Sequence, residues 1–265
     1  MSKGVNKIQI RSQGGEKMLT EERHSVILDM LNKQHSVHLS ELCKILNTSE
    51  STIRRDLTAL AEKNLLVKVH GGAIAVGDTF SPVEYNMTEK SQLNNEEKTA
   101  IAKYAASLIE DGDFIYIDAG TSTEKMVDFL PDKKATFVTN GIVHAKKIAQ
   151  MGFKVFILGG EFKPSTEAVV GTDCVLALQK YNFTKCFLGV NGISVSAGLS
   201  THDQNEASVK TAAMKKSKRV YILADHSKFD QITAMTFSTL ENVKIITDKL
   251  EDKKYFEKAN IKEVL

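Results

Sequence analysis

The sequence predicts an α/β chain: an N-terminal winged helix-turn-helix domain, then a larger domain built on a doubly wound parallel sheet. Two observations predict this fold. Before residue 76, three helical patterns are followed by a stretch in which apolar and polar residues alternate. After residue 84, six short apolar strands alternate with helices, which is typical of a parallel sheet covered on both faces. A chain of 265 residues is long enough for two domains.

Composition narrows the class of protein. Hydrophobic residues make up 42% and charged residues 26% of the chain, as in an ordinary globular protein. No apolar run is long enough for a membrane span, and no signal-peptide pattern opens the chain. The three cysteines (Cys43, Cys174 and Cys186) lie far apart, which predicts reduced thiols in the cytoplasm and not a disulfide frame or zinc site. A net charge of +2 is too small for a non-specific nucleic-acid binder, so any DNA contact must come from a few placed side chains.

The first domain is expected to span residues 18–76. Residues 1–17 mix Gly, Ser, Gln and Lys without periodicity and are expected to form a disordered leader. Thr20 is a plausible N-cap of a helix that runs to about Lys33. Ser40 is expected to cap a second helix, and a turn at Asn47–Thr48 leads to a third.

The third helix, Ser49–Leu60, carries the side chains most suited to DNA. Its apolar residues recur at i, i+4 and i+7, so they lie on one buried face. Ser49 is a good N-cap, and four polar side chains project from the first turns: Ser51, Thr52, Arg54 and Arg55. Hydroxyls and adjacent guanidinium groups at a helix start suit a DNA major groove, where arginine binds guanine or phosphate. Taken alone, the helix also fits an amphipathic surface helix; the helix-turn-helix order favours DNA.

A wing is expected after this helix. Alternation over residues 65–74 predicts a strand, which completes a winged helix with the extended stretch near Val37–Leu39. Lys68 and His70 are placed to contact phosphates, although His70 fits equally well as a turn residue before the glycine pair. Residues 77–83 contain Gly, Asp, Ser and Pro and predict an interdomain linker.

The second domain, residues 84–265, is expected to bind its ligand at the carboxyl ends of the strands. Residues 118–123 join the first strand to a helix, where free N–H groups and hydroxyls suit an anion. This stretch is neither a Walker A loop nor a GxGxxG fingerprint, so a nucleotide is not expected. It fits a small phosphorylated ligand or, equally, an ordinary helix cap.

Other strand ends add candidates for the same site. Gly160, Asn191 and Gly192 follow later strands, and Lys228 lies just past the fifth strand. Glu206 and Lys210 stand at i and i+4 on a helix, a spacing that often gives only a surface ion pair. No histidines have metal-ligand spacing, and no nucleophile–base arrangement is evident, so no metal, cofactor or catalytic residue is expected.

Several motifs carry a resemblance to a known family. Thr20–Ala73, with Ser51–Leu57 and Val69–Ala73, resembles the DNA-binding domain of the DeoR family of bacterial transcriptional repressors. The C-terminal motifs also match, in the right order: residues 118–121, 138–140, 158–160, 188–192, 198–201 and 224–229.

The resemblance implies a winged helix-turn-helix joined to a sensor domain similar to ribose-5-phosphate isomerase. Such sensors bind phosphorylated sugars or polyols, and the bound effector usually weakens operator binding. By position, the resemblance places Thr52, Arg54 and Arg55 on DNA. It places the effector against Asp118, Gly120, Thr121, Ser122 and Thr123, with Thr139, Asn140, Glu206, Lys210 and Lys228 as neighbours. The chain departs from the family pattern at Lys68, where Arg is frequent, and at Asn191, where an acidic residue is common.

Residues 139–144 and 165–168 most resemble repressors of fructose operons, which respond to fructose 1-phosphate. Lactose repressors that respond to tagatose 6-phosphate are the nearest rival. We therefore expect a protein that is not an enzyme and that binds double-stranded operator DNA and a phosphorylated sugar. It is expected to form a homo-oligomer, either a dimer or a tetramer, and not to bind a membrane. The alternative from another class is an isomerase-like enzyme that uses Asp118, Glu206 and Lys210. A third interpretation, N-terminal helices that serve dimerisation, is disfavoured because Arg54 and Arg55 would gain nothing by facing each other.

Overall fold

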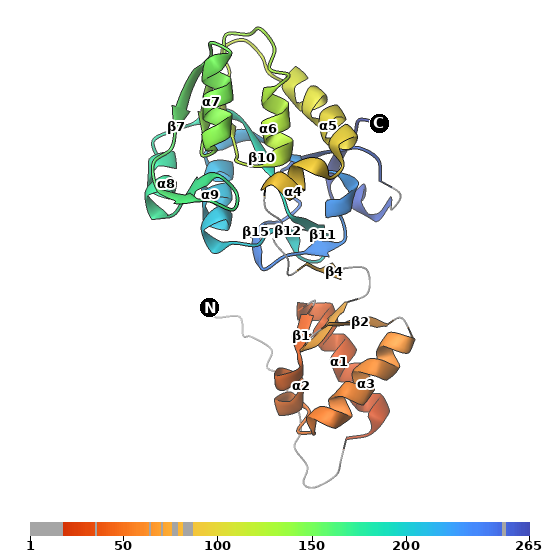
Figure 1. The fold of residues 1–265 in the computed structure, drawn as a ribbon. Helices are drawn as coiled ribbons and strands as arrows, with labels where there is room; N and C mark the ends of the chain where they lie inside the picture. Colours follow the sequence, from red (N-terminus) through yellow and green to blue (C-terminus); the bar gives the residue numbers. More distant parts are fainter. Residues whose placement is uncertain are drawn as a thin grey trace, which may run out of the picture. The chain divides into compact units, whose positions relative to one another are not determined.

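The computed structural model describes residues 18–34, 36–63, 65–69, 71–75, 79–81, 87–250 and 253–265. The predicted leader, residues 1–17, lies outside this range. The chain divides into two compact units, residues 1–76 and 77–265 (Figure 1). Within the described part, no helix is long and apolar enough to cross a membrane.

The first unit is a winged helix-turn-helix, as predicted. Its antiparallel sheet has the strand order β1-β3-β2, and its core includes Ile27, Leu42, Ile53 and Leu57. The helices and strands are α1 (Thr20–Gln34), β1 (Ser36–His38), α2 (Leu39–Ile45), α3 (Glu50–Glu62), β2 (Leu66–Val69) and β3 (Gly72–Ala75).

The two helices of the helix-turn-helix begin differently. The predicted cap at Ser40 is wrong: the N-cap is His38, two residues earlier, so α2 begins at Leu39, and no side chain caps it. Leu39 is buried in the core, so the helix begins directly after β1 ends at His38. Asn47 then adopts a left-handed conformation (φ 44°), which an asparagine tolerates and which ends α2. Ser49 caps α3 as predicted and accepts the N–H of Thr52.

A buried ion pair fixes α3 against α1. The Arg23 guanidinium donates from Nε to Asp56 Oδ2 at 2.8 Å and from Nη2 to Oδ1 at 3.0 Å. Asp56 lies on the buried side of α3, with 4% of its surface exposed. A two-bond contact of this kind fixes orientation as well as distance. It therefore holds the exposed face of α3 in place.

The second unit contains a parallel sheet of seven strands in the order β17-β16-β13-β10-β5-β6-β7. The chain runs outward from β5 through β6 to β7 and then returns to the other side of β5 with β10. This reversal makes the sheet doubly wound, with its switch point between β5 and β10. The strands are β5 (Phe114–Ile117), β6 (Thr136–Thr139), β7 (Lys154–Ile157), β10 (Phe183–Gly189), β13 (Ser217–Leu223), β16 (Lys244–Thr247) and β17 (Asn260–Glu263).

Helices cover both faces of this sheet, as alternation along the strands requires (Figure 1). On β5, Ile115 and Ile117 pack on one side with residues of three helices, whereas Tyr116 packs on the other with residues of two. The first side holds α5 (Asn95–Ser107), α6 (Thr121–Val127) and α7 (Ile142–Gln150), and the second holds α8 (Thr172–Leu178) and α9 (Gln204–Lys215).

Smaller elements surround the sheet. Three strands form an antiparallel sheet in the order β11-β12-β15, and β8 pairs with β9. These elements are β8 (Glu161–Lys163), β9 (Ala168–Val170), β11 (Gly192–Ser194), β12 (Gly198–Thr201), β15 (Met235–Ser238), helix α4 (Met87–Gln92) and the 3₁₀ turns η1 (His226–Lys228) and η2 (Lys253–Tyr255).

The predicted linker, residues 77–83, contains a short strand. β4 (Thr79–Phe80) pairs in parallel with β14 (Gln231–Ile232), and Ser81 N–H donates to Ile232 O at 2.9 Å. This part of the range therefore belongs to the second unit. Residues 77, 78, 82 and 83 lie outside the described part of the chain.

Candidate functional site

The start of α3 presents a polar face opposite the core. Ser51, Arg54 and Arg55 are exposed, whereas Ile53, Leu57 and Leu60 are buried. The Ser49 hydroxyl lies 3.0 Å from that of Ser51 and 2.9 Å from that of Thr52, so three hydroxyls gather at the helix N-terminus. This is the surface that the sequence predicted for DNA.

The two arginines differ in their contacts. Arg54 bonds Glu50 one turn earlier, but its side chain is 62% exposed, and exposed pairs of this kind contribute little to stability. Arg54 can therefore exchange Glu50 for phosphate. Arg55 has no hydrogen bond to the described residues. From the wing, Lys68 Nζ donates to Thr58 Oγ1 of α3 at 2.9 Å, which places this cation beside the helix. His70, the other predicted wing contact, lies outside the described residues.

The second unit holds a cavity of about 510 Å³ at the sheet's switch point, where β5 and β10 end. Seven of the predicted effector residues line it: Gly120, Thr121, Ser122, Asn191, Glu206, Lys210 and Lys228. The structure thus brings together residues from four separate stretches of the sequence. We call this cavity the switch-point pocket.

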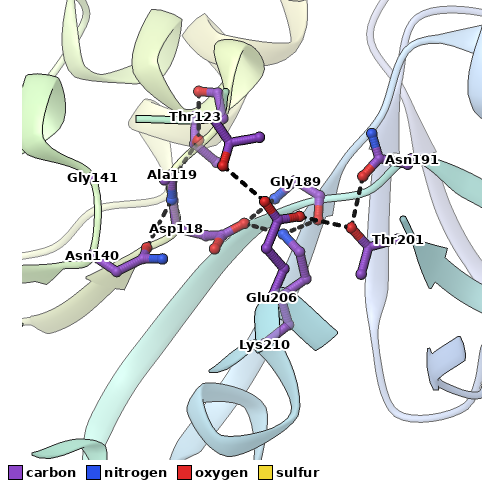
Figure 2. A network of polar contacts seen from close by, with 12 residues as sticks. Asp118, Ala119, Thr123, Asn140, Gly141, Gly189, Asn191, Thr201, Glu206 and Lys210 are labelled. Atoms are coloured by element: carbon purple, nitrogen blue, oxygen red, sulfur yellow. Dashed lines mark hydrogen bonds and ion pairs between the residues drawn. The ribbon is translucent and has the colours of Figure 1, made fainter. Parts of the chain in front are cut away.

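Asp118 holds a lysine at the floor of the pocket. Lys210 Nζ donates to Asp118 Oδ2 and, at 3.1 Å, to Gly189 O, while Gly189 N–H donates to the same carboxylate oxygen at 3.2 Å (Figure 2). Asp118 is 2% exposed, and burial raises the pKa of its carboxyl although Lys210 opposes the shift. Asp118 therefore positions Lys210 and does not itself line the pocket.

Glu206 is the carboxylate that faces the pocket. Its Oε1 accepts Thr166 Oγ1 at 2.8 Å and Lys163 Nζ at 3.1 Å, and its Oε2 lies 3.0 Å from Thr201 Oγ1. Burial would raise the pKa of Glu206, but the charges of Lys210 and Lys163 and the bond from Thr166 bring it below the ordinary value. Glu206 is therefore ionised. The i, i+4 spacing of Glu206 and Lys210 does not produce a surface ion pair, because both residues are buried and Lys210 donates to Asp118 instead.

Three predicted effector residues lie behind the pocket wall, because their oxygen atoms are already engaged in the buried loop. Asn140 Oδ1 accepts Tyr116 Oη and Ala119 N–H, both at 2.9 Å, and Thr123 Oγ1 donates to Asp118 O at 2.6 Å. Thr139 Oγ1 accepts Gly141 N–H at 3.0 Å. All three side chains are buried, so they hold the loops after β5 and β6 and do not line the pocket.

Gly160 and Gly192, the predicted effector glycines outside the pocket lining, also act through the backbone. A Cβ at Gly160 would lie 2.5 Å from Val170 O, and one at Gly192 would lie 2.5 Å from Gln231 O. Neither glycine lines the pocket. Each permits a close approach of two chain segments.

The sequence missed a second set of pocket residues. They are Asn94, the N-cap residue of α5, Lys98 within α5, and Ser227 and Gln231 from the segment η1–β14. Lys98 is 4% exposed and donates to Leu93 O at 2.6 Å and to Lys90 O; burial lowers its pKa despite nearby Asp225. A lysine among the inner-face residues of an apolar helix was the available signal.

A histidine behind the pocket makes stability depend on pH. His144 is fully buried, with Nε2 at 3.2 Å from Thr123 Oγ1 and from Gly120 O, and burial lowers its pKa from 6.5 to about 4. Between pH 6.5 and pH 4, the unfolded chain therefore binds a proton at His144 that the folded chain does not bind. The free energy of unfolding falls as the pH drops through this range. We expect His144 to cost about 2 kcal/mol between pH 7 and pH 5.

Chemical denaturation of the wild type and of His144→Gln at both pH values measures this cost. His226, whose pKa is raised by its bond to Asp248, acts with the opposite sign at higher pH and stays in both proteins. An equal pH dependence of the two proteins would contradict the assignment to His144.

Both units match known family models. Residues 23–79 match the DeoR-like helix-turn-helix domain, and residues 93–249 match the DeoR C terminal sensor domain. The chain belongs to the DeoR family. It is a transcriptional regulator and not an enzyme, as the sequence predicted.

Relatives of this DeoR-family chain match most of its length. The uncharacterized HTH-type transcriptional regulator FruR of Bacillus subtilis strain 168 is 43% identical over 251 residues, 93% of this chain and 99% of that protein. The lactose phosphotransferase system repressor of Staphylococcus aureus strain NCTC 8325 is 34% identical, over 89% of this chain and 94% of the repressor. Ribose 5-phosphate isomerase A of Methanocaldococcus jannaschii aligns with a TM-score of 0.40 and 15% identity, over 51% of this chain and 55% of the enzyme.

Proposed function

We propose that this DeoR-family protein represses a sugar-catabolic operon and that a phosphorylated sugar in the switch-point pocket releases it from operator DNA. On DNA, α3 enters the major groove with Ser51, Thr52, Arg54 and Arg55, while Lys68 lies beside it for a backbone phosphate. We expect the protein to act as a dimer or tetramer, since helix-turn-helix proteins read paired half-sites.

The observation that carries the effector class is the chemistry of the pocket. Lys98, Lys228, Thr121 and Ser122 offer ammonium groups and hydroxyls, which suit a phosphate. Glu206 offers an ionised carboxylate in the same cavity, which suits sugar hydroxyls and would repel a second anion. A volume of about 510 Å³ lies within the usual range for small-molecule sites.

Fructose 1-phosphate is the first candidate effector. Residues 139–144 and 165–168 resemble fructose-operon repressors, and the 43% identity to FruR agrees with that choice. The lactose repressors at 34% identity make tagatose 6-phosphate the second candidate.

A thermal-shift screen against these two compounds, with inorganic phosphate and unphosphorylated fructose as controls, tests the proposal. The true effector at 100 times its Kd should stabilise the protein by about 2.7 kcal/mol. Stabilisation by no phosphorylated sugar or polyol would contradict the effector class. Stabilisation by tagatose 6-phosphate alone would replace the first candidate with the second.

Gly120 offers a way to separate effector binding from DNA binding. A Cβ here would lie 3.4 Å from Thr123 Oγ1, so alanine fits, whereas a glutamate side chain would bring a negative charge into the pocket it lines. We expect Gly120→Glu to bind operator DNA like the wild type but to lose the effector response, about 5–150-fold in systems of this type. Gly120→Ala should respond normally. Gel-shift titrations of all three proteins measure this, and release of Gly120→Glu by the effector would refute the placement of the ligand.

A further inference from the structure

Three oxygen atoms at one end of the switch-point pocket share a single proton. Thr201 Oγ1 lies 2.8 Å from Asn191 Oδ1 and 3.0 Å from Glu206 Oε2 (Figure 2). A hydroxyl donates only one hydrogen bond, whereas an amide oxygen and a carboxylate oxygen only accept. With the amide in this orientation, one of the two contacts brings lone pairs face to face.

Glu206 does not supply the missing hydrogen-bond donor. Its pKa lies below the ordinary value, so its carboxylate carries no proton to donate. The other oxygen, Oε1, already accepts from Thr166 and Lys163. Among the described residues, Thr201 is the one hydroxyl within hydrogen-bond distance of Oε2.

Rotating the Asn191 amide by half a turn satisfies all three groups. Its nitrogen then donates to Thr201 Oγ1, and the Thr201 proton is free for Glu206 Oε2. An amide nitrogen and oxygen are nearly equal in size, so the hydrogen-bond network decides between the two orientations. The backbone stays fixed meanwhile, because Asn191 N–H donates to Ser200 O at 3.0 Å.

We propose that Asn191 turns its amide nitrogen to Thr201 and offers its carbonyl oxygen to the ligand, so that this end of the pocket accepts hydroxyl hydrogens. This rests on the proposed function, which supplies the ligand class. Asn191 and Glu206 then form an acceptor pair that binds the hydroxyl-bearing end of a sugar phosphate. The phosphate is directed to Lys98 and Lys228, which line the same cavity.

The orientation of the amide is testable without a ligand. In the NMR spectrum of the ligand-free chain, the Asn191 amide protons should show a nuclear Overhauser effect to the Thr201 methyl group. This effect should disappear in Asn191→Asp, which has no amide protons. An Asn191 amide resonance with no such effect, and no change in its shift in Thr201→Val, would overturn the proposal.

The ligand-facing atom is tested by affinity for fructose 1-phosphate, with inorganic phosphate as the reference probe. Asn191→Leu should weaken fructose 1-phosphate binding about tenfold or more and leave inorganic phosphate binding unchanged. Asn191→Asp keeps an acceptor at the same place and should bind fructose 1-phosphate more tightly than Asn191→Leu. If a nitrogen donor faced the ligand instead, Asn191→Asp would be the weaker of the two, and the proposal would be wrong.

Failure of the proposed function gives a different result. A wild type that binds inorganic phosphate but no sugar phosphate would remove both the effector class and the hydroxyl selection. The nuclear Overhauser effect would still decide the amide orientation by itself.

Discussion

Replacing Lys210 with methionine is expected to destabilise the second unit by about 3–5 kcal/mol at pH 7. The reason is that Lys210 is the ion-pair partner of the buried Asp118 carboxylate, which among the described residues would keep only the Gly189 N–H as a hydrogen-bond donor. Chemical denaturation followed by circular dichroism measures the loss. The Tm should fall on the order of 10 °C for a unit of this size.

A double variant separates the ion pair from simple packing. In Asp118→Asn with Lys210→Met, the buried charge is gone, and the asparagine oxygen can still accept the Gly189 N–H. We expect this double variant to be more stable than Lys210→Met alone, because the uncompensated charge dominates the cost. Equal stability of the single and double variants would show that Asp118 does not carry the effect.

Replacing Arg55 with alanine is expected to weaken operator binding by about 1–3 kcal/mol, or 5–150-fold. The Arg55 guanidinium is exposed on the first turns of α3 and has no hydrogen bond to the described residues, so it meets DNA without first breaking a contact. Arg54→Ala should weaken operator binding in the same range, although Arg54 must first give up its ion pair with Glu50 to reach DNA. A gel-shift titration at fixed salt gives both values.

Lys63→Ala is the matched control for this experiment. Lys63 is exposed at the far end of the same helix, so its removal changes the net charge equally without touching the first turns. We expect a clearly smaller loss for this variant. Arg55→Ala and Lys63→Ala with equal affinities would contradict the assignment of the recognition surface.

The sequence predicted the elements whose side chains repeat with a clear period. The stripe Ile53, Leu57 and Leu60 indicated α3, and the apolar runs indicated six of the seven strands in the main sheet. The seventh, β17, escaped notice because it is an edge strand with polar residues such as Asn260 and Lys262, a composition that protects sheet edges.

Most of the candidate site was predicted where a motif follows a strand, and Glu206 and Lys210 on α9 were predicted from their spacing on a helix. Motifs located the loop after β5 but did not tell which side chains line the pocket, since Thr123 and Asn140 use their oxygens to hold the loop. The pairing of Arg23 with Asp56 and the arrival of Lys98 at the pocket depend on contacts between distant segments. Periodicity places Lys98 on the inner face of its helix, but it does not tell which distant segment that lysine meets.

The most direct test of the account is a gel-shift titration of the full chain with a DNA duplex selected for binding from a random pool, at fixed salt. It is repeated with the phosphorylated sugar that gives the largest thermal shift. The account predicts that this ligand weakens DNA binding by about 5–150-fold and that Gly120→Glu does not respond. Unchanged DNA affinity at saturating ligand would contradict the claim that the switch-point pocket controls the DNA-binding helix.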